Sequence, residues 1–159
     1  MIAIERTRTR FAAFERRRER HQQLGRETGN LLAVHADAVA WVTHALGPAS
    51  IDRVILLYPN PYPKNSDRGK RWHAMPFMRK LIETLKPGGE LRLVTNERFY
   101  SDEAGRFMRE IWGLDEVEAL CFSAFELPPK IASQVPRTHF EKKYLARGET
   151  CYERLWKKP

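Results

Sequence analysis

The pattern with the clearest chemical content is a run of alternating prolines from Tyr58 to Lys64, with the sequence Tyr-Pro-Asn-Pro-Tyr-Pro-Lys. Each proline fixes its own φ and pushes the preceding residue toward extended backbone, so we expect a stiff loop with Tyr58, Asn60 and Tyr62 extended. The loop follows an apolar run at 52–57, and open α/β sheets bind ligands beyond the carboxyl ends of their strands. Asn60 is therefore a candidate site residue, although Asn also suits the turn itself.

Basic side chains follow this loop, and aromatic residues are interleaved with them. Cations can hold RNA phosphates, and aromatic rings offer stacking surfaces to an unstacked base. A charge run by itself is more often a solvated face, but the interleaved aromatics favour RNA. The cations are Lys64, Arg68, Lys70 and Arg71, and the aromatics are Tyr58, Tyr62, Trp72 and His73.

Two acidic residues near the N-terminus are candidates for ligand contact. Glu5 ends a short apolar run, and a carboxylate at the carboxyl end of a strand can accept two hydrogen bonds from a ribose diol. An ion pair with Arg6 or Arg8 explains Glu5 equally well. Asp37 precedes an apolar helical stretch, where Asp is a favoured N-cap, and this role is compatible with ligand contact.

The elements that position these residues alternate between short apolar runs and longer amphipathic ones, which is typical of a parallel sheet with crossover helices. We expect one α/β domain over residues 1–159, with the 52–57 strand buried on both faces. We interpret the arginines of the first helix as a solvated face rather than an RNA surface. The expected strands are 1–4, 31–35, 52–57, 90–95, 117–122 and 151–156; the expected helices are 6–26, 38–46, 72–85 and 102–112; and a loop is expected at 127–136.

The composition points to an anionic partner. The formal charge of +8, from 28 Lys and Arg against 20 Asp and Glu, fits RNA, DNA or an anionic membrane. The longest uncharged stretch, 38–51, is too short to cross a bilayer, and the N-terminus lacks the apolar segment of a secretory signal. Cys121, Cys151 and the histidines show no metal-ligand spacing. We therefore expect a cytoplasmic protein with no disulfide, metal site or membrane segment.

Several short motifs follow one another along nearly the whole chain. They are Ile2-Ala3-Ile4-Glu5, Asn30-Leu31, Asp37-Ala38, Tyr58 to Lys64, Leu85-Lys86-Pro87-Gly88-Gly89, Val94-Thr95-Asn96 with Tyr100, and Thr138-His139-Phe140-Glu141. In this order and spacing, the chain resembles the bacterial tRNA (guanine-N7)-methyltransferases, which are class I S-adenosylmethionine-dependent enzymes. The most specific motifs are the proline loop and the Thr-His-Phe-Glu segment near the C-terminus.

The resemblance implies a Rossmann-like fold, S-adenosylmethionine as cofactor and methylation of guanine N7 in tRNA. It implies that Glu5 holds the cofactor ribose, that Asp37 lies beside the adenine amino group, and that Asn60 contacts cofactor and guanine. Guanine N7 carries no proton, so the enzyme mainly aligns it with the methyl group and stabilises the resulting cation. The implied tRNA contacts are Lys64, Arg68, Lys70, Arg71, Asn96, Thr138, Phe140 and Glu141.

The chain departs from the family pattern in two ways. The family's fold opens with a strand and a Gly-rich turn that receive S-adenosylmethionine, and the four residues before Glu5 cannot supply them. We therefore expect an N-terminally truncated fold whose strands 1–4 and 52–57 each have an unpaired edge. Asn60 and Asn96 stand where the family usually has Asp, which removes two carboxylates. Two alternatives to tRNA methylation therefore stay open. One is a catalytically impaired RNA-binding remnant or partner subunit, and the other is a class I methyltransferase with a different substrate.

Overall fold

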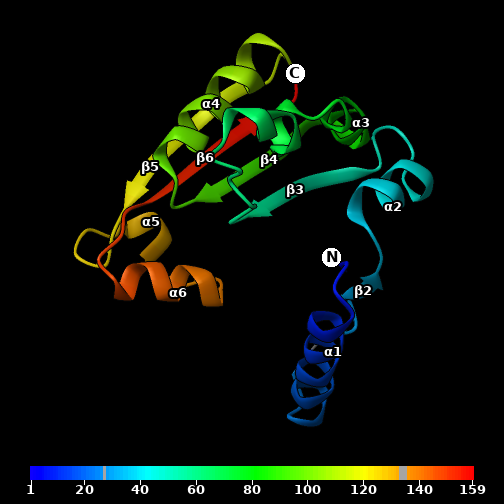
Figure 1. The fold of residues 1–159 in the computed structure, drawn as a ribbon. Helices are drawn as coiled ribbons and strands as arrows, with labels where there is room; N and C mark the ends of the chain where they lie inside the picture. The colour runs from blue at the N-terminus through cyan, green and yellow to red at the C-terminus, as the bar shows by residue number, and fades with distance from the viewer. Residues whose placement is uncertain (27, 133–135) are drawn as a thin grey trace. The chain divides into compact units, whose positions relative to one another are not determined.

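The computed structural model describes residues 1–26, 28–132 and 136–159, which form two compact units (Figure 1). The N-terminal unit is Met1–Leu46 and the C-terminal unit is Gly47–Pro159. Each unit combines helices with a sheet, in agreement with the predicted α/β class. That the whole chain forms one domain stays a prediction.

The N-terminal unit is a βαβ arrangement followed by a helix. Strands β1 (Ile2–Glu5) and β2 (Leu32–His35) pair in parallel, and α1 (Arg8–Gln23) connects them. Phe11 of α1 stacks on His35 with ring centroids 5.1 Å apart. The last helix is α2 (Ala38–Ala45), and its Val42 is the one buried hydrophobic residue of the unit among those described.

The C-terminal unit contains a four-stranded sheet with the order β3-β4-β6-β5. β3 and β4 are parallel, whereas β6 is antiparallel to both of its neighbours. Figure 1 shows β6 between β4 and β5, with α4 running along the sheet. The elements are β3 (Ile51–Leu57), the 3-10 helices Asn65–Lys70 and Trp72–Ala74, α3 (Phe77–Thr84), β4 (Leu85–Thr95), α4 (Arg98–Glu110), β5 (Asp115–Phe122), α5 (Pro129–Ala132), α6 (His139–Ala146) and β6 (Cys151–Lys157).

The core of the C-terminal unit joins the sheet to the helices around it. One cluster brings Val94, Phe122 and Cys151 of the strands against α5 and α6. The largest fully buried side chain is Trp156 of β6. Because buried apolar area is the main stabilising contribution, this cluster anchors α6 to the end of the sheet where β4 finishes and β6 begins.

The predicted edges of the two sheets are confirmed. Among the described residues, β1 pairs with β2 alone and β3 pairs with β4 alone. β1 and β3 are therefore both edge strands. The expectation that the 52–57 strand is buried on both faces is wrong, because Ile55 is 49% and Leu57 is 38% exposed. The reason is that β3 lies at the sheet edge, while α3 and α4 pack on β4.

Two helix predictions need correction. The helix expected at 72–85 is divided into a short 3-10 helix and α3, because Pro76 has no N–H and suits the start of a helix rather than its middle. The segment after Thr138, where no helix was among the expected elements, forms α6, and Thr138 is its N-cap. Its Thr-x-x-Glu pattern is a helix-start signal, and the Glu141 N–H donates to Thr138 Oγ1 at 3.1 Å.

The Lys-Pro-Gly-Gly turn is a close backbone approach at the start of β4. A Cβ on the buried Gly89 would lie 2.8 Å from the Lys86 carbonyl oxygen, and Gly88 has a φ of +72°. Both positions therefore require glycine. No described helix has the length and apolar character needed to cross a membrane, and no described cluster of His, Cys, Asp and Glu could hold a metal.

Candidate active site

The two acidic candidates of the N-terminal unit lie at one edge of its sheet. Glu5 ends β1 opposite His35, and Asp37 follows β2 directly, so both lie at the carboxyl edge. Glu5 Oε1 accepts the Thr7 N–H at 2.6 Å. Asp37 caps α2, where its Oδ1 accepts the N–H groups of residues 39 and 40 at 3.0 and 3.2 Å. The predicted N-cap role of Asp37 is confirmed.

Each of these carboxylates retains a second oxygen for a ligand. The bonds from the described residues reach Oε1 of Glu5 and Oδ1 of Asp37. Asp37 Oδ2 lies 3.8 Å from an Arg6 guanidinium nitrogen on the exposed surface, a contact that solvent weakens. Two acceptor oxygens at neighbouring strand ends fit a ligand that presents hydroxyl and amino donors, as a nucleoside does.

The proline loop of the C-terminal unit is strained rather than extended. Tyr58 has a φ of +50° and Tyr62 of +45°, so the extended geometry predicted for these two residues is wrong. The Tyr58 N–H still donates to the Val94 carbonyl oxygen at 2.7 Å, which extends the hydrogen bonding between β3 and β4. The Tyr58 side chain is held by a separate hydrogen bond to Glu141. Non-glycine residues in the left-handed region cost energy and persist only where surrounding contacts hold them.

Asn60 lies at the exposed centre of this loop. Its Oδ1 accepts the Tyr62 N–H at 3.3 Å, which is the turn-stabilising role that Asn commonly performs. The other donors and acceptors of the carboxamide remain for a ligand. Asn96 follows β4 and its Nδ2 donates to Glu149 Oε2 at 3.1 Å. Because β3 and β4 are parallel neighbours in register, both amides lie at the same edge of the sheet.

Arg71 has a structural role that sequence reasoning did not anticipate. It is 4% exposed, and its Nε and Nη2 donate to the Tyr62 carbonyl oxygen at 3.1 and 2.9 Å. Its Nη1 forms an ion pair with Glu103 of α4. The phosphate contact predicted for Arg71 therefore needs correction, because the guanidinium is buried and bonded within the protein. It ties the strained Tyr62 to α4.

The remaining cations after the loop are exposed. Lys64 is fully on the surface and has no ion pair among the described residues. Arg68 pairs with Glu103 Oε1 at 2.6 Å, and Lys70 pairs with Asp67 at 2.7 Å. Lys70 Nζ also lies 5.8 Å from the Tyr62 ring centroid. These cations and an aromatic ring thus occur together, as the sequence predicted, and the more exposed of the two pairs, Lys70 with Asp67, opens at little cost.

Glu103 connects three side chains beneath the loop. His73, which is buried, has its Nε2 2.9 Å from Glu103 Oε2. Burial lowers the pKa of His73 and outweighs the opposing effect of Glu103. Burial would raise the pKa of Glu103, but the bonds from His73 and Arg71 lower it below its usual value. Trp72 completes this support, since its N–H donates to the Tyr100 hydroxyl at 3.2 Å and its ring meets Phe77 edge-on at 5.7 Å.

The Thr138 to Glu141 segment divides into surface and interior. Thr138 caps α6 and Phe140 is 48% exposed. Glu141 is fully buried and its Oε1 accepts the Tyr58 hydroxyl at 2.8 Å and Arg137 Nη2 at 2.6 Å. The substrate contact predicted for Glu141 is therefore corrected, because its carboxylate is enclosed and bonded inside the protein. It holds the residue with which the proline loop begins.

The bonds around Glu141 extend into the sheet. Arg137 Nη1 donates to Glu153 at 2.7 Å, and Arg92 Nη1 donates to the other oxygen of Glu153 at 2.6 Å. Burial opposes the charge of Glu141, but the bonds from Arg137 and Tyr58 lower its pKa. Burial and the Glu141 bond raise the pKa of Tyr58. The phenol therefore stays protonated and donates at neutral pH. We call Tyr58, Arg92, Arg137, Glu141 and Glu153 the buried network.

Sequence reasoning missed most of this support. Glu103, Glu149 and Glu153 carry no local signal, because their partners are distant along the chain. Arg137 pairs with Glu141 four residues later, a spacing that was not used, and with the more distant Glu153. A surface depression of about 330 Å³ also escaped prediction, and it lies beside the amino end of β4, away from the two amides. Its lining residues are Arg79, Ile82, Glu83, Ile111, Trp112 and Lys158.

Comparison with known protein families shows the family to which this chain belongs. The sequence matches the model of the family described as "Putative methyltransferase" over residues 1–154. The chain belongs to this methyltransferase family. The match confirms the resemblance drawn from the ordered motifs, and the methyltransferase family accounts for both units, because the matched region includes each of them.

Two curated relatives of this chain share one name. The tRNA (guanine-N(7)-)-methyltransferase of Halorhodospira halophila is 30% identical over 134 residues, covering 80% of this chain and 53% of the relative. The enzyme of the same name from Acidithiobacillus ferrooxidans is 28% identical over 131 residues, covering 82% of this chain and 55% of the relative. The chain therefore spans about half the length of these relatives.

Solved structures confirm the Rossmann-like fold. The N-methyltransferase NodS from Bradyrhizobium japonicum has a TM-score of 0.58 at 12% identity, covering 99% of this chain and 66% of NodS. The cyclase SpnF has a TM-score of 0.57 at 14% identity, covering 99% of this chain and 65% of SpnF. Because a cyclase and a methyltransferase match equally well, this likeness shows the fold and leaves the reaction to the site residues.

Proposed function

We propose that the protein transfers a methyl group from S-adenosylmethionine to N7 of guanine in tRNA. The observation that carries this proposal is the placement of Asn60 and Asn96 together at the carboxyl edge of β3 and β4, in a chain that belongs to a methyltransferase family. Open α/β sheets bind their ligands at this edge. The names of the curated relatives supply the substrate class.

The acidic residues of the N-terminal unit are the proposed cofactor contacts. Glu5 offers its second carboxylate oxygen to the ribose hydroxyls, and Asp37 offers its second oxygen to the adenine amino group. Both residues fit the group, because each is held by backbone N–H bonds through one oxygen while the other accepts. When bound, S-adenosylmethionine supplies an electrophilic methyl group.

Asn60 is the proposed catalytic-site residue. Guanine N7 is a lone pair with no proton to remove, so the protein needs to position the purine and stabilise its growing positive charge. The exposed carboxamide can bond the purine edge, and the stiff loop fixes where it does so. An amide lacks the full charge of a carboxylate, and losing one such stabilising group costs roughly a hundredfold in rate.

Surface groups around this edge are the proposed tRNA contacts. Lys64, Arg68 and Lys70 would bind phosphates, and the exposed Phe140 would stack on a base. Asn96 would bond the substrate with its remaining amide oxygen, and Thr138 would act through the helix it caps. Arg71 and Glu141 act indirectly, by holding Tyr62 and Tyr58 at the ends of the loop.

Methyl transfer to unmodified tRNA is the direct test. The full chain is incubated with labelled S-adenosylmethionine and a tRNA transcript, and the digested nucleosides are separated. We expect 7-methylguanosine, a loss of at least tenfold in rate for Asn60→Ala, and a gain for Asn60→Asp because the carboxylate stabilises the purine cation. Asn65→Ala, on the exposed helix after the loop, is the matched control.

Two outcomes would contradict the proposal. Label on another atom would indicate a different substrate. Absence of transfer with cofactor demonstrably bound would favour the second candidate, an RNA-binding protein without turnover. The observation behind this second candidate is that both amides already have partners inside the protein, Asn60 with the Tyr62 N–H and Asn96 with Glu149. Tight tRNA binding without cofactor binding would support it.

The cytoplasm is the proposed location, because tRNA is modified where it is used. The cysteines agree with a reducing compartment, since Cys121 and Cys151 are both free. Burial raises the pKa of the Cys151 thiol, so it is expected to be inert.

A further inference from the structure

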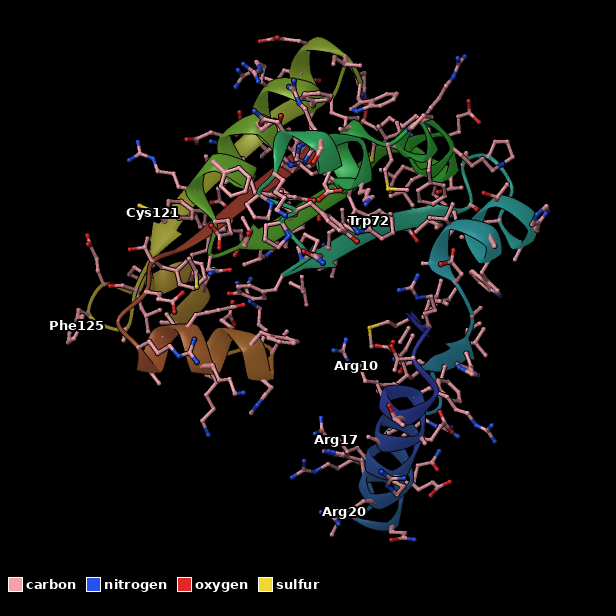
Figure 2. The ribbon with its side chains drawn as sticks, viewed as in Figure 1. Arg10, Arg17, Arg20, Trp72, Cys121 and Phe125 are labelled. Carbon is pink, nitrogen blue, oxygen red and sulfur yellow. The ribbon has the colours of Figure 1, made fainter. Side chains whose placement is uncertain are left out.

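The first helix presents a row of exposed arginines. Figure 2 shows Arg10, Arg17 and Arg20 along one side of α1, and Arg16 is exposed between them. Arg10 and Arg20 are ten residues apart on the helix, so the row is about 15 Å long. These four residues are named the arginine face.

The arginine face lacks the carboxylate partners that other surface cations have. Among the described residues, Arg18 pairs with Glu15 at 2.8 Å, whereas the four members have no ion pair. In the C-terminal unit, by contrast, most exposed arginines pair with a nearby carboxylate. The positive charge of the protein is therefore least neutralised on α1.

The distribution of charged residues on α1 does not favour the stability of the helix itself. The first turn of α1 contains no acidic residue, although acidic groups are preferred there because of the helix dipole. Arg16 and Arg20 are four residues apart, a spacing at which like charges repel. An anionic partner would relieve both effects. Phe11 stacks on His35 of β2, so this ring is engaged within the unit, whereas the arginine face presents guanidinium groups to solvent.

In place of the solvated face expected from the sequence, we propose that the arginine face binds the phosphate backbone of double-stranded RNA. The inference rests on the proposed function only in taking a structured RNA as the partner. Arginine binds phosphate with two parallel hydrogen bonds, and duplex RNA is recognised mainly through its shape and backbone. Because guanidinium groups bind phosphates, which are the same in every sequence, we expect binding to be independent of sequence.

The test compares salt dependence in matched charge variants. The full chain binds a fluorescent RNA duplex while salt is varied from about 50 to 200 mM, and each phosphate contact adds about 0.9 to the slope of log Kd against log salt. The variant Arg10→Gln, Arg17→Gln, Arg20→Gln should lower the slope by about two to three and weaken binding at least tenfold at low salt. Glutamine is a good helix former, and circular dichroism checks that α1 persists.

The control variant removes the same charge elsewhere. Arg79→Gln, Arg106→Gln and Arg109→Gln change exposed positions on α3 and α4 and should alter the slope by less than one. An equal decrease in both variants would overturn the proposal, because net charge alone would explain it. An unchanged slope in the α1 variant would also overturn it and would leave a protein partner as the occupant of this face.

The two proposals fail separately. Duplex binding that depends on the arginine face, without methyl transfer by the wild-type chain, refutes the proposed function and supports this inference. Methyl transfer by the wild-type chain, together with duplex binding that does not depend on the arginine face, supports the proposed function and refutes this inference. A second duplex of unrelated sequence should bind equally well, whereas a strong sequence preference would contradict recognition through the backbone.

Discussion

Tyr58 and Tyr62 show how single residues hold the proposed catalytic loop. Both adopt the left-handed conformation, and both are secured by charged groups that lie far away in the sequence. Glu141 of α6 accepts the Tyr58 hydroxyl, and Arg71 donates to the Tyr62 carbonyl oxygen. Asn60 lies between these two fixed points, so its position is set by buried charges rather than by the prolines alone.

Backbone strain at Tyr62 predicts an unusual order of stability. Tyr62→Ala and Tyr62→Gly both remove the ring, but only alanine keeps the Cβ that disfavours a φ of +45°. The glycine variant should be more stable than the alanine variant by about 0.5–1 kcal/mol, measured by urea unfolding. Ser66, within a 3-10 helix, is the control position, where alanine should be the more stable. The same order at both positions would contradict strain at Tyr62.

The buried network predicts an acid-sensitive contribution to stability. Glu141→Gln leaves the Arg137 charge without its full partner and should lower the free energy of unfolding by about 2–4 kcal/mol at pH 7. The folded-state pKa of Glu141 is lowered. Because it lies below the unfolded value of about 4.3, the stabilisation is complete above about pH 5 and is lost as the pH falls through the folded-state pKa.

Urea unfolding of wild type and Glu141→Gln at several pH values measures this effect. The difference between the two proteins should shrink as the pH decreases. Glu110→Gln, at an exposed position on α4, should show little difference at any pH. A Glu141→Gln deficit that is constant down to acidic pH would mean that lost packing, not lost charge, causes the destabilisation.

At the scale of elements, α6 connects the segment that begins at Thr138 to the proline loop that begins at Tyr58. The helix begins at a capped Thr138 and delivers Glu141 one turn later to Tyr58. Its inner residue Leu145 packs in the same cluster as Val94 and Cys151. A helix of eight residues is short, so its cap and its packing determine whether it forms.

Removal of the cap should therefore weaken α6 measurably. Thr138→Ala removes the oxygen that accepts the Glu141 N–H and should destabilise the protein by about 1 kcal/mol. Thermal unfolding provides the measurement. Thr150→Ala, at an exposed position before β6, should change the melting temperature much less. Equal shifts for the two variants would argue against the cap.

The sequence predicts these elements unevenly, and the reasons are physical. Alternating apolar runs locate the strands and most helices within a few residues, and Asp37 announces the start of α2 correctly. The division near Pro76 and the start of α6 were misjudged, although proline chemistry and the Thr-x-x-Glu pattern were available as signals. The burial of Arg71 and Glu141 could not be predicted, because it depends on partners brought close only by the folded sheet.

At the scale of the whole molecule, the two units differ in the size of their interiors. The N-terminal unit has a two-stranded sheet and one buried hydrophobic residue, Val42, among those described. The C-terminal unit has four strands and nearly all of the buried side chains. Two strands alone are marginally stable in water, so the two units are expected to differ in local stability.

Hydrogen exchange followed by mass spectrometry should resolve this difference. Amides of β1 and β2 should exchange faster than those of β4 and β6, because less buried apolar area opposes their opening. Addition of S-adenosylmethionine should slow exchange at β1 and β2 if Glu5 and Asp37 hold it, since a ligand stabilises the state it binds. Equal protection in the two sheets without ligand would contradict the expected order.

Trp72 gives the protein a built-in optical probe. It follows Arg71 directly, its N–H is fixed by Tyr100, and its half-buried ring rests against Phe77 (Figure 2). A ligand that shifts the proline loop would change the solvent exposure of this indole and hence its emission wavelength. Trp156 is fully buried, and it contributes the background signal together with Trp41 and Trp112, which also lie outside the loop. Occupancy of the loop can thus be followed by intrinsic fluorescence, without attaching a dye.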